Sequence, residues 1–327
     1  MRIGVEALRC PADGSALRHD GEELVCAGEG HRYPVVEGAP VLIDDHSSLF
    51  SVAGVTASRG VTPRRGLLER LAYRIRPMPA DNPFASDRLE RFRDLLLADS
   101  PGARPRVLVV GGGALGAGME AIAADPRLEI VDSDVYLGER VAVACDAHRL
   151  PFADGCFDGV VVQAVLEHVL SPATVVAEIH RVLRDGGIVY AETPFMQAVH
   201  EGAFDFTRFT DLGHRRLFGR FEELDRGVAV GPGSSLLWAL RYFARALPRS
   251  GGVMVRLLDF GVSCCFFWLV YADRRLVDHP GAYDAASGVW FMGRRATDAI
   301  DDRLLIAQYR GVAAGKSTGD RGFPTEP

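Results

Sequence analysis

The sequence predicts an α/β protein with a doubly wound, mostly parallel sheet and a small β-rich module at the N-terminus. Two observations support this fold class. From residue 106 onward, short β-branched runs alternate with segments of helical periodicity, which favours a parallel sheet covered on both faces. Residues 1–50 instead contain short apolar runs separated by glycines and prolines, a pattern typical of a separate small unit of strands and turns.

The elements of the main domain follow in a regular order. A helix is expected from residue 84, with Ser86 as its N-cap. A second helix should begin at Ser171 and Pro172 and end at Gly186 and Gly187. The apolar runs predict strands at RVLVV (106–110), LEIV (128–131), GVVVQ (159–163), IVYAET (188–193) and, as an edge strand, SGVWFMGRR (287–295).

Composition divides the 327 residues into five segments. After the module at 1–50, an arginine- and proline-rich linker covers 51–83 and the main domain covers 84–230. An extension at 231–310 is expected to complete the substrate side, and 311–327 should form a mobile tail. Six cysteines and the lack of a secretory apolar region in the first residues predict a cytoplasmic protein with reduced thiols.

Net charge and hydropathy limit the partners. A net charge of −6 excludes a protein whose whole surface binds nucleic acid. The run GVSCCFFWLVYA (261–272) is about a dozen residues long, which is too short to span a membrane. With Arg256 nearby, it predicts peripheral contact with the inner face of a membrane.

The glycine turn VLVVGGGALGAG predicts a ligand site at the end of the first main strand. Glycines at Gly111, Gly113 and Gly116 permit positive φ and a close approach of ligand to backbone, and a helix dipole is expected to follow. About twenty residues further on, Asp132 and Asp134 can accept hydrogen bonds from ribose hydroxyls, with Asp134 preferred. This pattern suits NAD and S-adenosylmethionine (SAM) equally, so a nicotinamide oxidoreductase is one alternative.

Two further sequence blocks distinguish between NAD and SAM. CDAHRLPFADGCFDGVVVQAVLEHV and EIHRVLRDGGIVYAETP resemble the class I SAM-dependent methyltransferases in order and spacing. The resemblance implies that SAM is the cofactor, that Asp146 and Ala147 lie along its adenine, and that the stretch from Gln163 to His168 lies beside its methyl group. Val110 stands where family members commonly carry an acidic residue, so the SAM ammonium needs another partner.

The stretch from Pro194 to Phe218 is rich in His, Asp, Arg and aromatic residues at the expected carboxyl end of a strand. It contains an H-E-G-x-x-D-F-x-R-F-T pattern that resembles methyltransferases of glycan and envelope pathways. We predict His200 as a catalytic base, Asp205 as its orienting partner and Arg208 as a substrate-binding group, with His214 as a second candidate base. In the alternative, Asp205 and Arg208 pair with each other and brace the loop.

The N-terminal module resembles the zinc-ribbon-like modules of some methyltransferases and the small Trm112-like proteins. Zinc prefers four Cys or His ligands, and here Asp13 occupies one ligand position. The module therefore either binds Zn2+ through Cys10, Asp13, Cys26 and His31 or folds without metal.

The predicted function is O-methylation of a glycan, lipid-linked or small-metabolite acceptor by SAM. Methylation of RNA is a second enzymatic alternative, because the arginines between Arg59 and Arg76 can contact phosphates, although few stacking aromatics accompany them. A non-catalytic SAM-fold binding protein is the third alternative.

Overall fold

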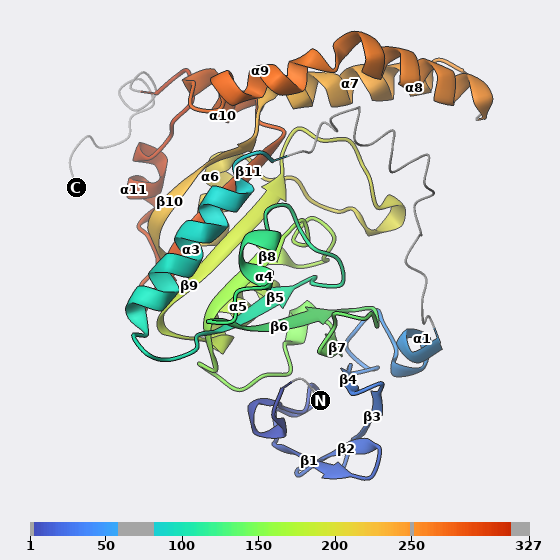
Figure 1. The fold of residues 1–327 in the computed structure, drawn as a ribbon, viewed down its shortest axis with the longest axis vertical. Coiled ribbons are helices and arrows are strands. Elements are labelled where there is room, and N and C mark those ends of the chain that lie inside the picture. The colour runs from blue at the N-terminus through green and yellow to red at the C-terminus, as the bar shows by residue number, and fades with distance from the viewer. Residues whose placement is uncertain (1–2, 58–81, 249–251, 315–327) are drawn as a thin grey trace.

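The computed structural model describes residues 3–57, 82–248 and 252–314 (Figure 1). Its strands form one eleven-stranded sheet in the order β1-β2-β3-β4-β7-β6-β5-β8-β9-β11-β10. The central pairs from β4 to β9 are parallel, which confirms the predicted α/β class with a mostly parallel core. These parallel strands are β4 (Ala39–Leu42), β5 (Arg106–Val110), β6 (Glu129–Asp134), β7 (Val143–Cys145), β8 (Phe157–Gln163) and β9 (Leu183–Pro194).

The strand order reverses direction between β5 and β8. From β5 the chain proceeds outward through β6 to β7, and it then returns to β8 on the other side of β5. In open α/β sheets the ligand crevice lies outside the carboxyl ends of the strands at such a reversal. The glycine turn that follows β5 is therefore at the position where a ligand is expected.

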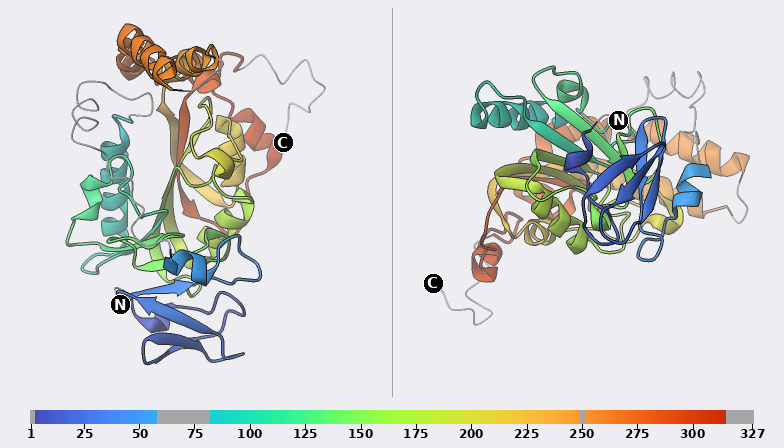
Figure 2. Two further views of the ribbon diagram at one scale, coloured as in Figure 1. Left: turned by 90° about the vertical axis from the view of Figure 1, so that its right-hand side faces the viewer. Right: turned by 90° about the horizontal axis from the view of Figure 1, so that it is seen from below.

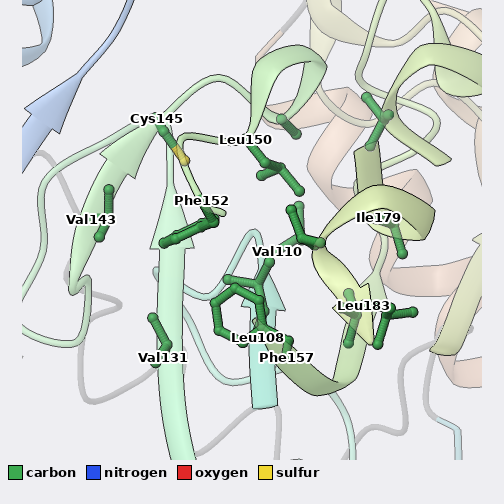
Figure 3. Close-up of a cluster of buried hydrophobic side chains, with 14 of the residues drawn as sticks. Leu108, Val110, Val131, Val143, Cys145, Leu150, Phe152, Phe157, Ile179 and Leu183 are labelled. Atoms are coloured by element: carbon green, nitrogen blue, oxygen red, sulfur yellow. The ribbon is translucent and has the colours of Figure 1, made fainter. Parts of the chain in front are cut away.

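Alternating residues of the central strands face two layers of helix. Val107 and Val109 pack in one core with α3 (Ala85–Asp99) and α4 (Glu120–Ala123). Leu108 and Val110 face the opposite core with α5 (Pro172–Val182), where Figure 3 shows them near Ile179. Both faces of the sheet are therefore buried, as the β-branched runs predict.

Two predicted boundaries are wrong. Ser86 lies inside α3, whose N-cap is Phe84 and has no side-chain cap. Ser171 does cap α5 by accepting from the amide of Thr174, but α5 ends at Val182 and β9 begins at Leu183. Gly186, at φ 69°, thus lies within an irregular first part of β9, where the pairing with β8 shifts register.

The N-terminal module continues the main sheet. Its strands are β1 (Leu17–Asp20), β2 (Glu23–Cys26), β3 (Arg32–Val36) and β4, preceded by the short helix η1 (Val5–Ala7). Val41 and Leu42 of β4 pair in parallel with β7, and Leu8 bridges to Phe152. Leu8 and Phe152 share one buried cluster, so the expected separation of this module from the main domain is not seen. Figure 2 shows the module packed against the lower edge of the sheet.

The predicted linker begins with α1 (Val52–Ala57), and its arginines from Arg59 to Arg76 lie outside the described residues, as does the tail beyond Ala314.

The predicted edge strand is β11 (Gly288–Arg295), which pairs on both sides, with β9 and with β10 (Phe221–Val230). The edge is therefore β10. The remaining helices are η2 (Ala147–Arg149), η3 (Gly202–Phe204), α6 (Asp211–Leu217), α7 (Pro232–Ala246), α8 (Val253–Phe266), α9 (Trp268–Leu276), α10 (Pro280–Ala285) and α11 (Asp302–Ala307).

Helices α7, α8 and α9 form a layer across the end of the molecule opposite the N-terminal module (Figures 1 and 2). Within the described residues, no single helix has the length and apolar composition of a membrane span. Together α8 and α9 meet both criteria, with a bend of 46° between them.

Candidate active site

The turn after β5 depends on glycine. Gly111 has φ 76°, and a Cβ there would clash with Cγ2 of Val165. The next two amides are fixed, since Gly112 donates to the carbonyl of Ser133 and Gly113 donates to the carboxylate of Asp134. The helix expected directly after this turn is only the four-residue α4, which begins at Glu120, so no helix N-terminus directly follows the turn.

A cavity of about 490 Å³ lies over the strand ends. Of the two candidate carboxylates, Asp134 lines this cavity and Asp132 does not. Asp132 is buried and bonds Nη2 of Arg140 at 3.0 Å. Other predicted residues on the cavity wall are Gly111, Asp146, Ala147 and His168. Val110 also lines the cavity. This position, where family members commonly carry an acidic side chain, therefore presents an apolar side chain to the ligand.

Asp146 is held as a carboxylate by a short network. Its Oδ1 accepts from the amide and Nδ1 of His148, and its Oδ2 accepts from the hydroxyl of Ser48 at 2.5 Å. Burial opposes the charge, but these hydrogen bonds outweigh it and hold the pKa of Asp146 below its usual value. His148 Nε2 accepts from the amide of Ser171, so the imidazole is oriented at both nitrogens.

The N-terminal segment forms part of the wall of this cavity. Phe50 stacks on Phe204 with ring centroids 6.1 Å apart and meets Tyr136 edge-on. All three rings line the cavity. Ser48 and Phe50 were not predicted as site residues, because nothing in their local pattern indicates that residues near 50 reach a site about a hundred residues further along the chain.

These residues suit SAM. The pair Asp134 and Asp146 can accept from ribose hydroxyls and from an adenine amine, and the apolar wall of Ala147, Val165 and Leu170 matches an adenine ring. The glycine turn lets a ligand approach the backbone more closely than a Cβ would permit.

A second cavity of about 340 Å³ lies beside the first and shares Ala164 with it. Ala164 has φ 52°, a strained conformation for a residue other than glycine. Predicted residues Gly116, Gln163 and His200 line this cavity, together with Glu167, Glu192 and Trp238. A methyl donor in the first cavity would thus have an acceptor space next to it.

Glu192 is a site residue that the sequence did not predict, and Glu167 was predicted only as part of the stretch from Gln163 to His168, without a role of its own. Burial raises the pKa of Glu167 to about 8. Burial also raises the pKa of Glu192, which accepts from Asn82 at 2.8 Å and from the hydroxyl of Tyr190. Glu167 belongs to the L-E-H block, so the sequence shows that it lies beside His168. The sequence does not show that its side chain is buried.

The loop after β9 brings His200, Asp205 and Arg208 together. The amide of His200 donates to Asp205 at 2.9 Å. Arg208 forms a bidentate pair with Asp205, keeps the pKa of that carboxyl far below its usual range, and donates to the carbonyls of Gln197 and Ala198. Neither Asp205 nor Arg208 lines either cavity. The geometry therefore favours the loop-bracing alternative for this pair.

His214 is wrong as a candidate base. It is 1% exposed in α6 and packs against Phe209 and Phe218. Burial, with a smaller contribution from the charge of Arg226, lowers the pKa of His214 to about 3. It lines neither of the two cavities.

This burial predicts acid sensitivity. In the unfolded chain His214 takes up a proton as the pH falls below its ordinary pKa, whereas the folded chain keeps it neutral. The free energy of unfolding should therefore fall on acidification, by about 2 kcal/mol between pH 7 and pH 5 from this residue alone. Denaturant unfolding of His214→Phe should show a correspondingly weaker dependence on pH than the wild type. Equal pH dependence in the two proteins would contradict the assignment.

The N-terminal module brings its four candidate metal ligands together. Cys10, Asp13, Cys26 and His31 each offer an atom within 4.8 Å of the others. Cys26 Sγ lies 3.0 Å from Asp13 Oδ2, and Cys10 Sγ lies 3.6 Å from His31 Nδ1. The arrangement is compatible with a four-ligand zinc site.

Comparison with known proteins identifies the central segment. Residues 113–191 match a methyltransferase domain. An uncharacterized chloroplastic methyltransferase of Arabidopsis thaliana is 44% identical over 69 residues, 21% of this chain and 18% of that protein. A demethylmenaquinone methyltransferase of Beutenbergia cavernae is 37% identical over 118 residues, 32% of this chain and 48% of that protein. The chain thus spans less than half the length of either relative.

Among solved structures, the phosphoethanolamine N-methyltransferase 2 of Haemonchus contortus, in complex with S-adenosyl-L-methionine, has a TM-score of 0.38 and 15% identity. The similarity covers 64% of this chain and 53% of that one. The methyltransferase domain match supports SAM over the nicotinamide alternative.

The glycine requirement at the turn after β5 can be tested with two variants. Gly111→Ala combines a positive φ with a close contact to Val165, so we expect it to weaken SAM binding at least about tenfold, a change of about 1.4 kcal/mol. Gly102 is a matched control because it has φ 77° and open space within 4 Å of the position that a Cβ would take. Gly102→Ala should lower stability slightly and leave SAM affinity unchanged. Calorimetric titration of both variants measures this difference, and equal affinities would contradict it.

Proposed function

We propose that this chain is a SAM-dependent methyltransferase that methylates an oxygen of a glycan, lipid-linked or small-metabolite acceptor. The observation that carries the proposal is the contact between the two cavities, one suited to an adenosyl group and the other lined by titratable side chains. SAM supplies an electrophilic methyl group on a sulfonium. In-line transfer of such a group depends mainly on the approach geometry of the acceptor.

The chain's own residues have distinct parts in this proposal. Asp134 and Asp146 hold the nucleoside, and the Phe50–Phe204 contact limits access of water to it. His200 lies on the wall of the acceptor cavity, where it can control the proton of an acceptor hydroxyl. Asp205 and Arg208 position the loop that carries His200.

The test is incubation of the purified chain with SAM labelled in its methyl group and with fractionated cell extract. We expect label in the carbohydrate, lipid or small-metabolite fraction, and at least about a tenfold lower rate with His200→Ala. Label in RNA would support the RNA alternative instead. No label in any fraction, with SAM bound, would support a non-catalytic binding protein, and unchanged turnover of His200→Ala would exclude a role for this side chain.

We further propose that the layer of α7–α9 rests on the inner face of an anionic membrane, as part of a cytoplasmic, peripherally bound protein. Large apolar side chains are exposed on all three helices: Phe243, Val253, Met254, Leu257, Phe260 and Trp268. Arg256, Arg274 and Arg275 are exposed among them and give the surface charges that complement acidic headgroups. Trp238 of α7 also lines the acceptor cavity, so a lipid-linked acceptor would reach it from this side.

Vesicle sedimentation tests this docking. We expect binding to vesicles containing phosphatidylglycerol, weaker binding to neutral vesicles, and loss of binding in Leu257→Asp. Leu304→Asp on α11 is a matched control, because Leu257 and Leu304 are each 59% exposed. Vesicle binding unaffected by Leu257→Asp would contradict the proposal, as would a stable dimer that buries this layer and does not bind vesicles.

The N-terminal cluster of Cys10, Asp13, Cys26 and His31 is proposed to bind Zn2+. Elemental analysis of the purified chain should find zinc that is lost in Cys26→Ser. A folded module without zinc would favour the metal-free alternative.

A further inference from the structure

We infer that Glu167, His168 and His200 form a second metal site, for one divalent cation, at the junction of the two cavities. Each residue offers one ligand atom, and these atoms all lie within 4.8 Å of one another. Oε1 of Glu167 lies 3.6 Å from Nε2 of His168 and 3.8 Å from Nε2 of His200. Such spacings let a single cation, with ligand bonds of about 2.0–2.2 Å, contact all three with only small side-chain shifts.

The carboxylate of Glu167 gives independent support for a ligand. Its side chain is 1% exposed, and neither oxygen receives a hydrogen bond from the described part of the chain. A buried polar group without a hydrogen-bond partner is costly to the fold. Since the two imidazole nitrogens are near but beyond hydrogen-bond distance, a cation between them and the carboxylate would satisfy all three groups.

The two histidines are already oriented for this role. Nδ1 of His168 lies 2.7 Å from the carbonyl of Phe204, which can only accept, so Nδ1 carries the proton and the Nε2 lone pair faces Glu167. Nδ1 of His200 lies 3.4 Å from the carbonyl of Ala198 and 3.5 Å from the Asp205 carboxylate, which Arg208 holds in place. Hydrogen bonding of the distal imidazole nitrogen to a carbonyl or carboxylate is the usual outer support of a metal ligand.

The ligand set indicates the class of cation. Two histidines and one carboxylate leave coordination positions open and suit Mn2+, Fe2+ or Zn2+, whereas the thiols of the N-terminal cluster favour zinc. The open side faces the acceptor space, because Glu167 and His200 both line the second cavity. Mn2+ therefore distinguishes this site from the N-terminal one.

The role of the cation rests on the proposed function, although its binding does not. A divalent cation here would bind the acceptor hydroxyl and lower its pKa. The hydroxyl proton then passes to water, the new O–C bond forms as the S–C bond of SAM breaks, and S-adenosylhomocysteine leaves. His200 acts in this scheme as a ligand instead of taking the proton itself.

The test is titration of the full, chelator-treated chain with Mn2+. Binding is measured as the loss of the electron paramagnetic resonance signal of the free ion. We expect one bound Mn2+ per chain and at least a tenfold weaker affinity in Glu167→Gln. His200→Ala provides a second variant, because His200 is on an exposed loop and its removal should leave the fold intact. Cys26→Ser is the control and should bind Mn2+ like the wild type.

Absence of Mn2+ binding to the wild type, or binding unchanged in folded Glu167→Gln and His200→Ala, would overturn the inference. The readout does not involve methyl transfer, so a chain that binds Mn2+ but transfers no methyl group would contradict only the proposed function. If both hold, EDTA should abolish methyl transfer and Mn2+ should restore it. Chelator-resistant transfer would overturn the catalytic role of the cation.

Discussion

Asp134→Ala is expected to weaken SAM binding by about 10- to 150-fold. This range corresponds to about 1.5–3 kcal/mol for hydrogen bonds that a carboxylate accepts from a bound ligand. Asp134 also accepts from the amides of Gly113 and Tyr136, so its loss should loosen the glycine turn as well. Calorimetric titration with SAM measures the change.

Asp132→Asn is the matched control, since Asp132 pairs with Arg140 and does not line the cavity. It should lower thermal stability and leave SAM affinity within about twofold of wild type. The reverse pattern, with affinity lost in Asp132→Asn and kept in Asp134→Ala, would show that Asp132 binds the ribose in place of Asp134.

Leu8→Ala is expected to lower the free energy of unfolding of the whole chain by about 2–5 kcal/mol. Leu8 is fully buried, shares a core cluster with Phe152, and lies next to Arg9, whose amide donates to the carbonyl of Pro151. Because the N-terminal strands join the main sheet, denaturant unfolding should remain a single transition shifted to lower midpoint.

Leu304→Ala provides the comparison, because Leu304 is 59% exposed and its truncation should cost less than about 0.5 kcal/mol. Two separate transitions, with Leu8→Ala shifting only the smaller one, would show that the N-terminal module folds independently.

Local sequence patterns predicted the central strands and the glycine turn. The run from Arg106 to Val110 is buried on both faces and ends at a glycine with positive φ, and both features leave a short-range signature in the sequence. The cap of α5 at Ser171 was also predicted correctly, because capping depends on residues only three apart in the sequence.

The site features that the sequence did not predict arise mainly from contacts between distant residues. The pairing of Leu42 with Cys145 and the stacking of Phe50 on Phe204 each join segments about a hundred or more residues apart. The candidate site was similarly predicted in part. Asp132 and Asp134 were named from their place after the glycine turn, Asp146 from the family resemblance and His200 from its side-chain chemistry. The burial of Glu167 instead depends on the loop after β9, whose amides at Phe206 and Thr207 donate to the Glu167 carbonyl.

Titration of the purified chain with SAM, S-adenosylhomocysteine and NAD tests the central claim, that the cavity beside the glycine turn holds an adenosyl sulfonium. We expect SAM and S-adenosylhomocysteine to bind with one site per chain, to be weakened by Asp134→Ala, and to be unaffected by NAD. Binding of NAD in place of SAM, or SAM binding that Asp134→Ala and Gly111→Ala leave intact, would contradict the account.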